Sequence, residues 1–221
     1  MLANLRDLPL FDGVARLFKR AKPESRRWIV LDVETSGLNP YSDKLLAIAA
    51  VTVQVSPDFK HVSIVIGDSY EAVLKQDLPS NKDNILIHHI GAQAQSEGRE
   101  PIEVLEEFRQ WVGDCPLLAF HSAFDEAMIE RAYSLYGLKP LQNEWLDIEP
   151  LAKITGVNPK LRALDDWLEY FGIECAVRHQ AAADTFATAE LLMRLWPYLT
   201  KEANSWASLR SVARQASWIP R

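Results

Sequence analysis

The sequence predicts an α/β fold in which helices cover a mixed β-sheet. Apolar segments of strand length, rich in β-branched residues, fill most of residues 28–74. From residue 101 onward, apolar residues recur mainly at helical spacing, with two short apolar strands between the helices. Strands first, followed by strands alternating with helices, indicate this class of fold. The chain has 221 residues, 48% hydrophobic and 24% charged, which suits one soluble domain with extensions.

The strand segments follow one another directly, which favours antiparallel neighbours. The turn Ser56-Pro57-Asp58 separates the second strand from the third. Gly67-Asp68 predicts a hairpin-type turn between the third and the fourth. The expected strands are Trp28–Val33, Leu45–Val55, His61–Ile66 and Ser69–Leu74.

Helical periodicity dominates the rest of the chain. Pro101 suits the first turn of a helix, whereas Gly137 and Pro197 are expected to end helices. The expected elements are a helix over Pro101–Val112, a strand over Pro116–Phe120, a helix from Ala127 to Tyr136, a strand over Trp145–Asp147, and helices over Glu149–Thr155, Leu164–Phe171, Ala181–Trp196 and Ala203–Arg214.

Positive charge is concentrated at the two ends of the chain. Residues 1–27 and 194–221 each carry a net charge of +4, which leaves −14 for residues 28–193 out of a total of −6. Apolar residues at helical spacing predict a basic helical arm over 1–27, which Pro23 ends. Packing on the domain surface, contact with nucleic acid and binding of a partner are all open for this arm. We expect a central domain over 28–197 and a helical tail over 198–221, which contains Trp206 and Trp218.

The sequence shows no sign of secretion or of a membrane span. Asp7, Asp12 and Arg16 interrupt any candidate signal peptide, and no apolar run is long enough to cross a bilayer. Cys115 and Cys175 have neither a disulfide framework nor zinc-ligand spacing. We therefore expect two reduced, buried thiols in a cytoplasmic protein.

Two acidic residues lie at the end of the first expected strand. Asp32 and Glu34 are two positions apart, so their side chains project from the same face. At about 4 Å, two like charges repel by roughly 4 kcal/mol at an effective dielectric constant of 20. A strand that places these carboxylates together is expected to hold a positive charge between them.

Other polar residues occupy strand-to-helix junctions. Asp125 follows a short apolar strand, and N-capping of the next helix is its simpler explanation when it is taken alone. His179 precedes Asp184 by five residues, so the two side chains converge only if His179 lies in the loop before the helix. Taken alone, His179 is more simply explained as a structural residue.

Taken together, these residues are four carboxylates and one histidine, without a cysteine. Oxygen ligands suit Mg²⁺ or Mn²⁺ and disfavour Zn²⁺. Several carboxylates around one point hold two such ions about 3.5–4 Å apart, which is the arrangement for in-line displacement at phosphorus.

Three ordered segments of the chain resemble the motifs of a known enzyme family. The family is that of the DEDD-type 3′–5′ exonucleases, in the histidine-using branch that includes the proofreading epsilon subunit of bacterial DNA polymerase III and RNase T. The resemblance runs from about Trp28 to Trp196 and implies an RNase H-like fold with a mixed five-stranded sheet flanked by helices. The segments are Asp32-Val33-Glu34-Thr35-Ser36-Gly37, His121-Ser122-Ala123-Phe124-Asp125 and His179–Asp184, and Ile87-His88-His89-Ile90-Gly91 resembles a fourth family segment.

The resemblance also implies a role for each catalytic position. Asp32, Glu34 and Asp184 would bind one Mg²⁺ or Mn²⁺ ion, and Asp32 and Asp125 would bind a second. His179 would be the general base that deprotonates the attacking water, because an imidazole with a reference pKa of about 6.5 is mostly neutral near pH 8. The implied reaction is hydrolysis of the 3′-terminal phosphodiester of single-stranded DNA or RNA, with release of a nucleoside 5′-monophosphate.

The resemblance is less complete at the substrate-binding positions. Thr35, Leu38, His88 and Phe124 lie where the family grips the terminal nucleotide, although packing and loop structure would also explain them. Three residues depart from the family pattern and affect this grip: Ser122, His89 and Gly91.

Three other functions are compatible with the sequence. The chain could bind nucleic-acid 3′ ends without cutting them, although all five catalytic positions are filled. It could work as a polymerase-associated subunit, with the basic arm or the Trp-containing tail contacting a polymerase or another protein. It could also be a different metal phosphohydrolase acting on nucleotides or small phosphodiesters.

Overall fold

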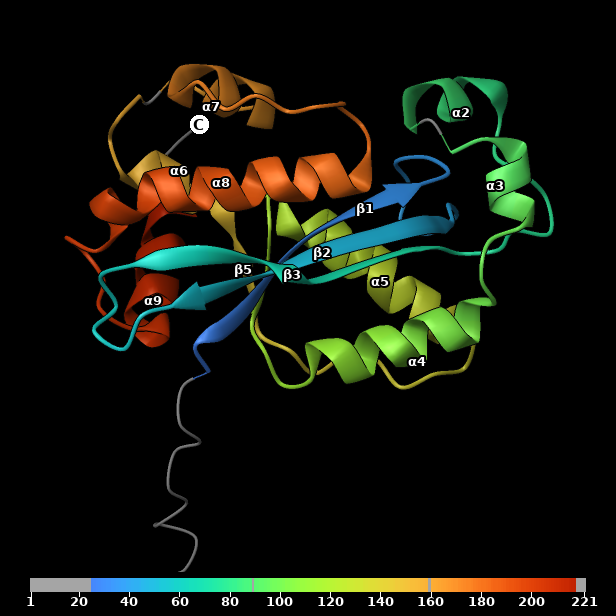
Figure 1. Ribbon diagram of the computed structural model, residues 1–221, viewed down its shortest axis with the longest axis horizontal. Coiled ribbons are helices and arrows are strands. Elements are labelled where there is room, and N and C mark those ends of the chain that lie inside the picture. Colours follow the sequence, from blue (N-terminus) through green and yellow to red (C-terminus); the bar gives the residue numbers. More distant parts are fainter. Residues whose placement is uncertain (1–24, 89, 159, 218–221) are drawn as a thin grey trace, which may run out of the picture.

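A computed structural model describes residues 25–88, 90–158 and 160–217, and these form a mixed five-stranded sheet with helices on both faces (Figure 1). The strand order is β3-β2-β1-β4-β5; β2 is antiparallel to its neighbours β1 and β3, and β4 is parallel to its neighbours β1 and β5. The predicted fold class is therefore confirmed. The strands are β1 (Arg27–Thr35), β2 (Leu45–Val55), β3 (Val62–Val73), β4 (Leu117–Ala119) and β5 (Trp145–Asp147).

Helices α4 and α5 lie on one face of the sheet, and α8, with α6, α7 and α9, lies on the other (Figure 1). Two short helices, α2 and α3, follow β3 at one end of the molecule. The helices are α2 (Lys82–His88), α3 (Ala92–Ser96), α4 (Pro101–Val112), α5 (Ser122–Leu135), α6 (Ile148–Ile154), α7 (Leu164–Phe171), α8 (Ala181–Leu199) and α9 (Trp206–Ser217).

The alternation of side chains along β1 divides the core into two layers. Trp28 and Val30 pack toward α8, whereas Ile29 and Leu31 pack toward α4 and α5. Because the period is two, Asp32 and Glu34 continue the series of residues on the α8 face. The same periodicity that builds the core thus brings both acids to the face covered by α8.

The predicted hairpin at Gly67-Asp68 is wrong, because β3 is one strand with a bulge. The partner of Val51 is Ser69, whereas the next residue of β2, Thr52, pairs with Val65. The Asp68 carboxylate accepts hydrogen bonds from Thr52 Oγ1 at 2.7 Å and from Arg27 Nε at 2.7 Å. These bonds keep the segment against β2 instead of turning it away.

Three further features differ from the predictions. Helix α8 does not end at Pro197 but continues to Leu199. Pro197 has no N–H to donate to the carbonyl of Met193, and Met193 is partly exposed. Helices α2 and α3 were not predicted, because they are short and lack an apolar period. The two cysteines were expected to be buried, but both are only half-buried.

The end regions are described only in part. Residues 1–24 of the predicted arm and Trp218 of the predicted tail lie outside the described residues. Trp206 packs edge-to-face on Trp28, with ring centroids 4.8 Å apart, and is buried in the core. In the described part of the chain, no helix has both the length and the apolarity of a membrane span.

Replacing Asp68 with Asn is expected to lower the free energy of unfolding by about 1–2 kcal/mol at pH 7, because a charged acceptor is lost at a partly exposed site. The Arg27 guanidinium lowers the pKa of Asp68 to about 2, from an ordinary value near 3.8. A carboxyl group whose pKa is lower in the folded state stabilises the fold fully at pH values above its ordinary pKa. This contribution decreases below that pKa and is lost as the pH falls through about 2.

Urea unfolding of Asp68→Asn and of the parent chain at pH 7 and at pH 2.5 measures this contribution. The difference in free energy of unfolding between Asp68→Asn and the parent chain should be smaller at pH 2.5 than at pH 7. Asp77→Asn, at an exposed position, serves as the control. An equal loss at both pH values would contradict the role of the ionised carboxylate.

Candidate active site

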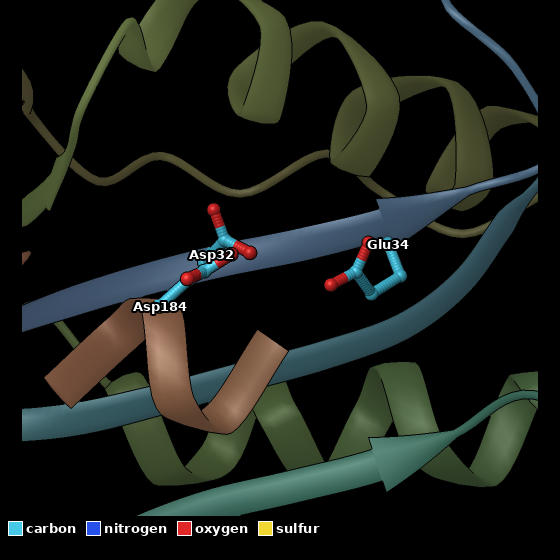
Figure 2. A group of neighbouring side chains, drawn as sticks. All are labelled: Asp32, Glu34 and Asp184. Carbon is cyan, nitrogen blue, oxygen red and sulfur yellow. The ribbon is translucent and has the colours of Figure 1, made fainter. Parts of the chain in front are cut away.

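Three predicted carboxylates meet at the end of β1. Asp32, Glu34 and Asp184 each offer a ligand oxygen, and these oxygens all lie within 4.8 Å of one another. Figure 2 shows Asp184 on its helix facing Asp32, with Glu34 farther along β1 toward the end of the strand. Glu34 and Asp184 are buried and Asp32 is half-buried. The group is therefore a compact, largely enclosed set of oxygen ligands.

A hydrogen bond between α8 and the sheet holds Asp184 in this position. Thr185, the next residue, is buried and donates from Oγ1 to the carbonyl of Ala49 at 3.1 Å. Ala49 is the partner of Asp32 in the β1–β2 ladder. The first turn of α8 is thus attached to the sheet directly beside Asp32.

The Glu34 carboxylate is poorly satisfied by the protein itself. Only 3% of Glu34 is exposed, and its Oε1 has no hydrogen-bond partner among the described residues. Its Oε2 lies against Nδ1 of His88, on α2. Asn84, one turn earlier on the same helix, donates to the carbonyl of Thr35 at 2.7 Å and so attaches α2 to the end of β1. A buried carboxylate oxygen without a partner indicates that a ligand belongs beside it.

Asp125 is buried at the start of α5, which follows β4. It is not one of the three residues in the close cluster. Burial raises its pKa well above the usual range, backbone N–H groups of Asp125 and Val33 oppose this rise, and the charges of Asp147 and Glu34 add to it. Asp125 therefore belongs to the same electrostatic group, and it is carried by α5 and not by β1 or α8.

Burial likewise raises the pKa of Asp32 well above its usual range. The carboxylates of Asp125 and Glu34 raise this pKa further, and Arg178 opposes them. Both shifts have the same cause: acids share an enclosed space with too little positive charge. A bound divalent cation would favour the ionised form of each carboxyl.

His179 lies in the loop before α8, as its proposed role requires. Its side chain is exposed, its φ is +62°, and its backbone N–H donates to Asp184 Oδ2 at 3.0 Å. Its ring meets that of His88 at an angle of 88°, with centroids 6.4 Å apart. The loop therefore holds the exposed imidazole beside His88, with the backbone of His179 bonded to the Asp184 carboxylate.

Two further residues of this loop contact Asp184. Arg178 pairs with Asp184 and also with Asp165 on α7. The thiol of Cys175 lies 3.4 Å from Asp184 Oδ1. Arg178 thus supplies one positive charge to the acidic cluster and fixes the residue that precedes His179.

The predicted substrate contacts differ in their surroundings. Thr35 is buried, and its hydroxyl donates to the carbonyl of Gly37 at 2.7 Å. Leu38 is 87% exposed in the loop after β1, whereas Phe124 is half-buried and packs on the α4–α5 side of the core. His88 contacts Glu34. Their roles in substrate binding stay predictions.

Sequence reasoning missed three residues that shape the site. Asp147, at the end of β5, accepts hydrogen bonds from the backbone N–H of His121 at 2.9 Å and of Glu149 at 3.0 Å. An acid at the end of an apolar strand was the available signal. Arg178 and Asn84 had no comparable signal, because their partners are known only from the fold.

The donor set fits a hard divalent cation. Three carboxylates place oxygens within 4.8 Å of one another, one buried oxygen lacks a partner among the described residues, and the carboxyl groups of Asp32 and Asp125 have raised pKa values. Oxygen donors of this kind match Mg²⁺ or Mn²⁺ better than softer metals.

The model of the Exonuclease family matches residues 29–192, which include every predicted motif. The chain belongs to this family. The sequence-based resemblance to the 3′–5′ exonucleases, which are hydrolases that depend on divalent metals, is thereby confirmed.

Relatives in sequence include DNA polymerases. The chain is 28% identical over 200 residues to a PolC-type DNA polymerase III of Staphylococcus epidermidis, and 28% identical over 197 residues to that of Staphylococcus aureus. Each match covers 88% of this chain but only 13% of the relative. The chain thus spans a small part of the length of these relatives.

Solved nuclease structures share the fold. Exonuclease I of E. coli, bound to a dA16 oligonucleotide, superposes with a TM-score of 0.64 at 19% identity, covering 80% of this chain and 44% of that one. Exonuclease X in complex with 5′ overhanging duplex DNA gives a TM-score of 0.62 at 17% identity, covering 84% and 99%. The predicted RNase H-like fold is confirmed.

Adding Mn²⁺ is expected to raise the melting temperature of the chain, because the ion binds the folded carboxylate cluster and not the unfolded chain. At a hundredfold excess over its Kd, one bound ion contributes about 2.7 kcal/mol. Differential scanning fluorimetry, with and without EDTA, measures the shift.

Glu34→Gln should remove most of this shift, whereas Glu103→Gln, on the exposed side of α4, should leave it unchanged. A shift of the same size in both variants would place the bound ion elsewhere.

Proposed function

We propose that this chain is a divalent-metal-dependent 3′–5′ exonuclease that removes nucleoside 5′-monophosphates from single-stranded nucleic acid. The observation that carries the proposal is the meeting of Asp32, Glu34 and Asp184 within 4.8 Å, beside the exposed His179. The family match supports the same reaction class.

Each carboxylate has a distinct task in the proposed site. Asp32, Glu34 and Asp184 would hold one Mg²⁺ or Mn²⁺ ion, and Asp125, with Asp32, would hold a second. When bound, two such ions offset negative charge at the reacting phosphate and at the leaving oxygen. Asp125 is buried in the first turn of α5, and its charge raises the pKa of Asp32, which supports its assignment to a second ion beside Asp32.

His179 would act as the general base. A neutral imidazole can accept the proton of an attacking water, and this contributes typically 10²–10⁴-fold to a rate. Two contacts support the role: the backbone N–H of His179 is fixed by Asp184, and Arg178 is held by Asp165 and Asp184. Both restrict the loop while leaving the ring exposed.

The substrate would be a 3′ end of single-stranded DNA or RNA, gripped by Thr35, Leu38, His88 and Phe124. Oligonucleotide-bound exonuclease I and the PolC-type relatives support a DNA substrate and association with a polymerase. A cytoplasmic location, favoured by the two free thiols, belongs to the same proposal.

A protein that binds 3′ ends without cutting them is the main alternative. We favour the enzyme because the chain also carries residues that binding alone does not need. Both His179 and the buried Asp125 would be dispensable for simple retention of a strand end.

Asp32→Ala is expected to abolish stepwise shortening of a 5′-labelled oligonucleotide in Mg²⁺ or Mn²⁺, because it removes a carboxylate shared by both proposed ions. His179→Ala should slow the reaction by about 10²–10⁴-fold. His61→Ala, an exposed histidine at the β2–β3 turn, is the matched control and should match the parent chain.

Denaturing gels on single-stranded DNA, duplex DNA, mismatched duplex and RNA give the rates and identify the substrate. Inactivity of the parent chain on all four, in both metals, would refute the enzyme and leave the binding alternative.

A further inference from the structure

We propose that the groove between the loop 36–44 and helix α5 binds the nucleotides upstream of the one removed, with Tyr41 as a stacking platform for their bases. The inference rests on the proposed exonuclease function and extends it to a second part of the substrate.

The groove has a volume of about 750 Å³, which is within the usual range for ligand sites. One wall is the loop, with Pro40 and Tyr41, and the other is α5 and the segment after it, with Arg131, Leu135 and Leu138. Both walls lead away from the candidate active site along the chain, because the loop begins two residues after Glu34 and α5 carries Asp125 in its first turn. The groove therefore offers a path for a strand whose 3′ end lies at the carboxylates.

The loop that carries Tyr41 is held by a dense set of hydrogen bonds. Asp43 Oδ2 accepts from the Asn39 N–H at 2.8 Å, and Asn39 Oδ1 accepts from the Tyr41 N–H at 2.9 Å. Arg131 Nε donates to the carbonyl of Asp43 at 3.0 Å, which attaches the loop to α5. A side chain on Gly37 would collide with the Asp43 carboxylate, since an added Cβ would lie 2.5 Å from it.

This fixed loop nevertheless presents Tyr41 to solvent, with 87% of the residue exposed. Across the groove, Leu135 is 58% exposed. A rigid backbone that holds an aromatic ring in water loses little conformational entropy when a flat partner stacks on that ring. Nucleic-acid bases are such partners, and aromatic platforms are how proteins bind single strands without regard to sequence.

The charges of the groove indicate how the strand would lie. The lining of the groove includes the positively charged Arg131, which attracts phosphate, and the negatively charged Glu130, which repels it. Phosphates are therefore expected on the side of Arg131, with the bases turned toward Tyr41 and Leu135. This orientation combines a cation for the backbone with apolar surface for the bases.

The test compares substrates of increasing length. Steady-state KM is measured for the p-nitrophenyl ester of thymidine 5′-monophosphate, which has no upstream nucleotide, and for oligothymidylates of two to ten residues. Tyr41→Ala is expected to raise KM by about tenfold or more for the long oligomers, with the loss growing with length and smallest for the ester. Tyr41→Trp, which keeps a stacking surface, should restore the KM of the long oligomers.

Tyr198→Ala, a partly exposed tyrosine at the far end of α8, is the matched control and should show no dependence of its effect on length. Equal effects of Tyr41→Ala at all lengths, or no effect at any length, would overturn the inference. A change in the oligomeric state of the Tyr41→Ala variant, measured by light scattering, would also overturn the inference, because the groove would then be a surface for self-association. Inactivity of the parent chain on all of these substrates and on RNA would refute the proposed function itself, and this outcome is distinguishable from a failure of the inference alone.

Discussion

The structure is organised around the mutual repulsion of carboxylates at the end of β1. Asp32, Glu34 and Asp184 place their oxygens within 4.8 Å, and the pKa of Asp32 is raised by burial and by its acidic neighbours. A fold gains nothing from such a group unless a cation joins it, because each close pair of like charges costs free energy. Arg178 supplies one positive charge, which leaves the cluster with an excess of acid.

The rest of the fold serves to hold these acids together. The two-residue period of β1 directs Asp32 and Glu34 to the α8 face, and the bond from Thr185 to Ala49 sets the first turn of α8 beside them. Asp125 lies in the first turn of α5, the helix that follows the parallel strand β4. Ligands gather at this edge because the carboxyl ends of parallel strands meet there. The loop with His179 is in turn fixed by Asp184, so the proposed base and a proposed ligand share one local structure.

Sequence reasoning selected the four acids and the histidine because each follows a readable pattern: a strand period, a strand-to-helix junction or a family motif. The structure brings the oxygens of three of them, Asp32, Glu34 and Asp184, within 4.8 Å of one another. It failed where long-range contacts decide the local structure. The bulge in β3 exists because Asp68 bonds Arg27 and Thr52, which lie 41 and 16 residues away in the sequence. Helix α2 is only seven residues long, and its Asn84 donates a hydrogen bond to the carbonyl of Thr35, 49 residues away in the sequence. No local pattern encodes such partners.

The most direct measurement is anomalous diffraction at the manganese absorption edge from crystals of the chain grown with Mn²⁺. The account predicts an anomalous peak in contact with Asp32, Glu34 and Asp184, and a second peak between Asp32 and Asp125 when a nucleotide is bound. Full occupancy of Mn²⁺ elsewhere on the chain, with no peak at these carboxylates, would contradict it.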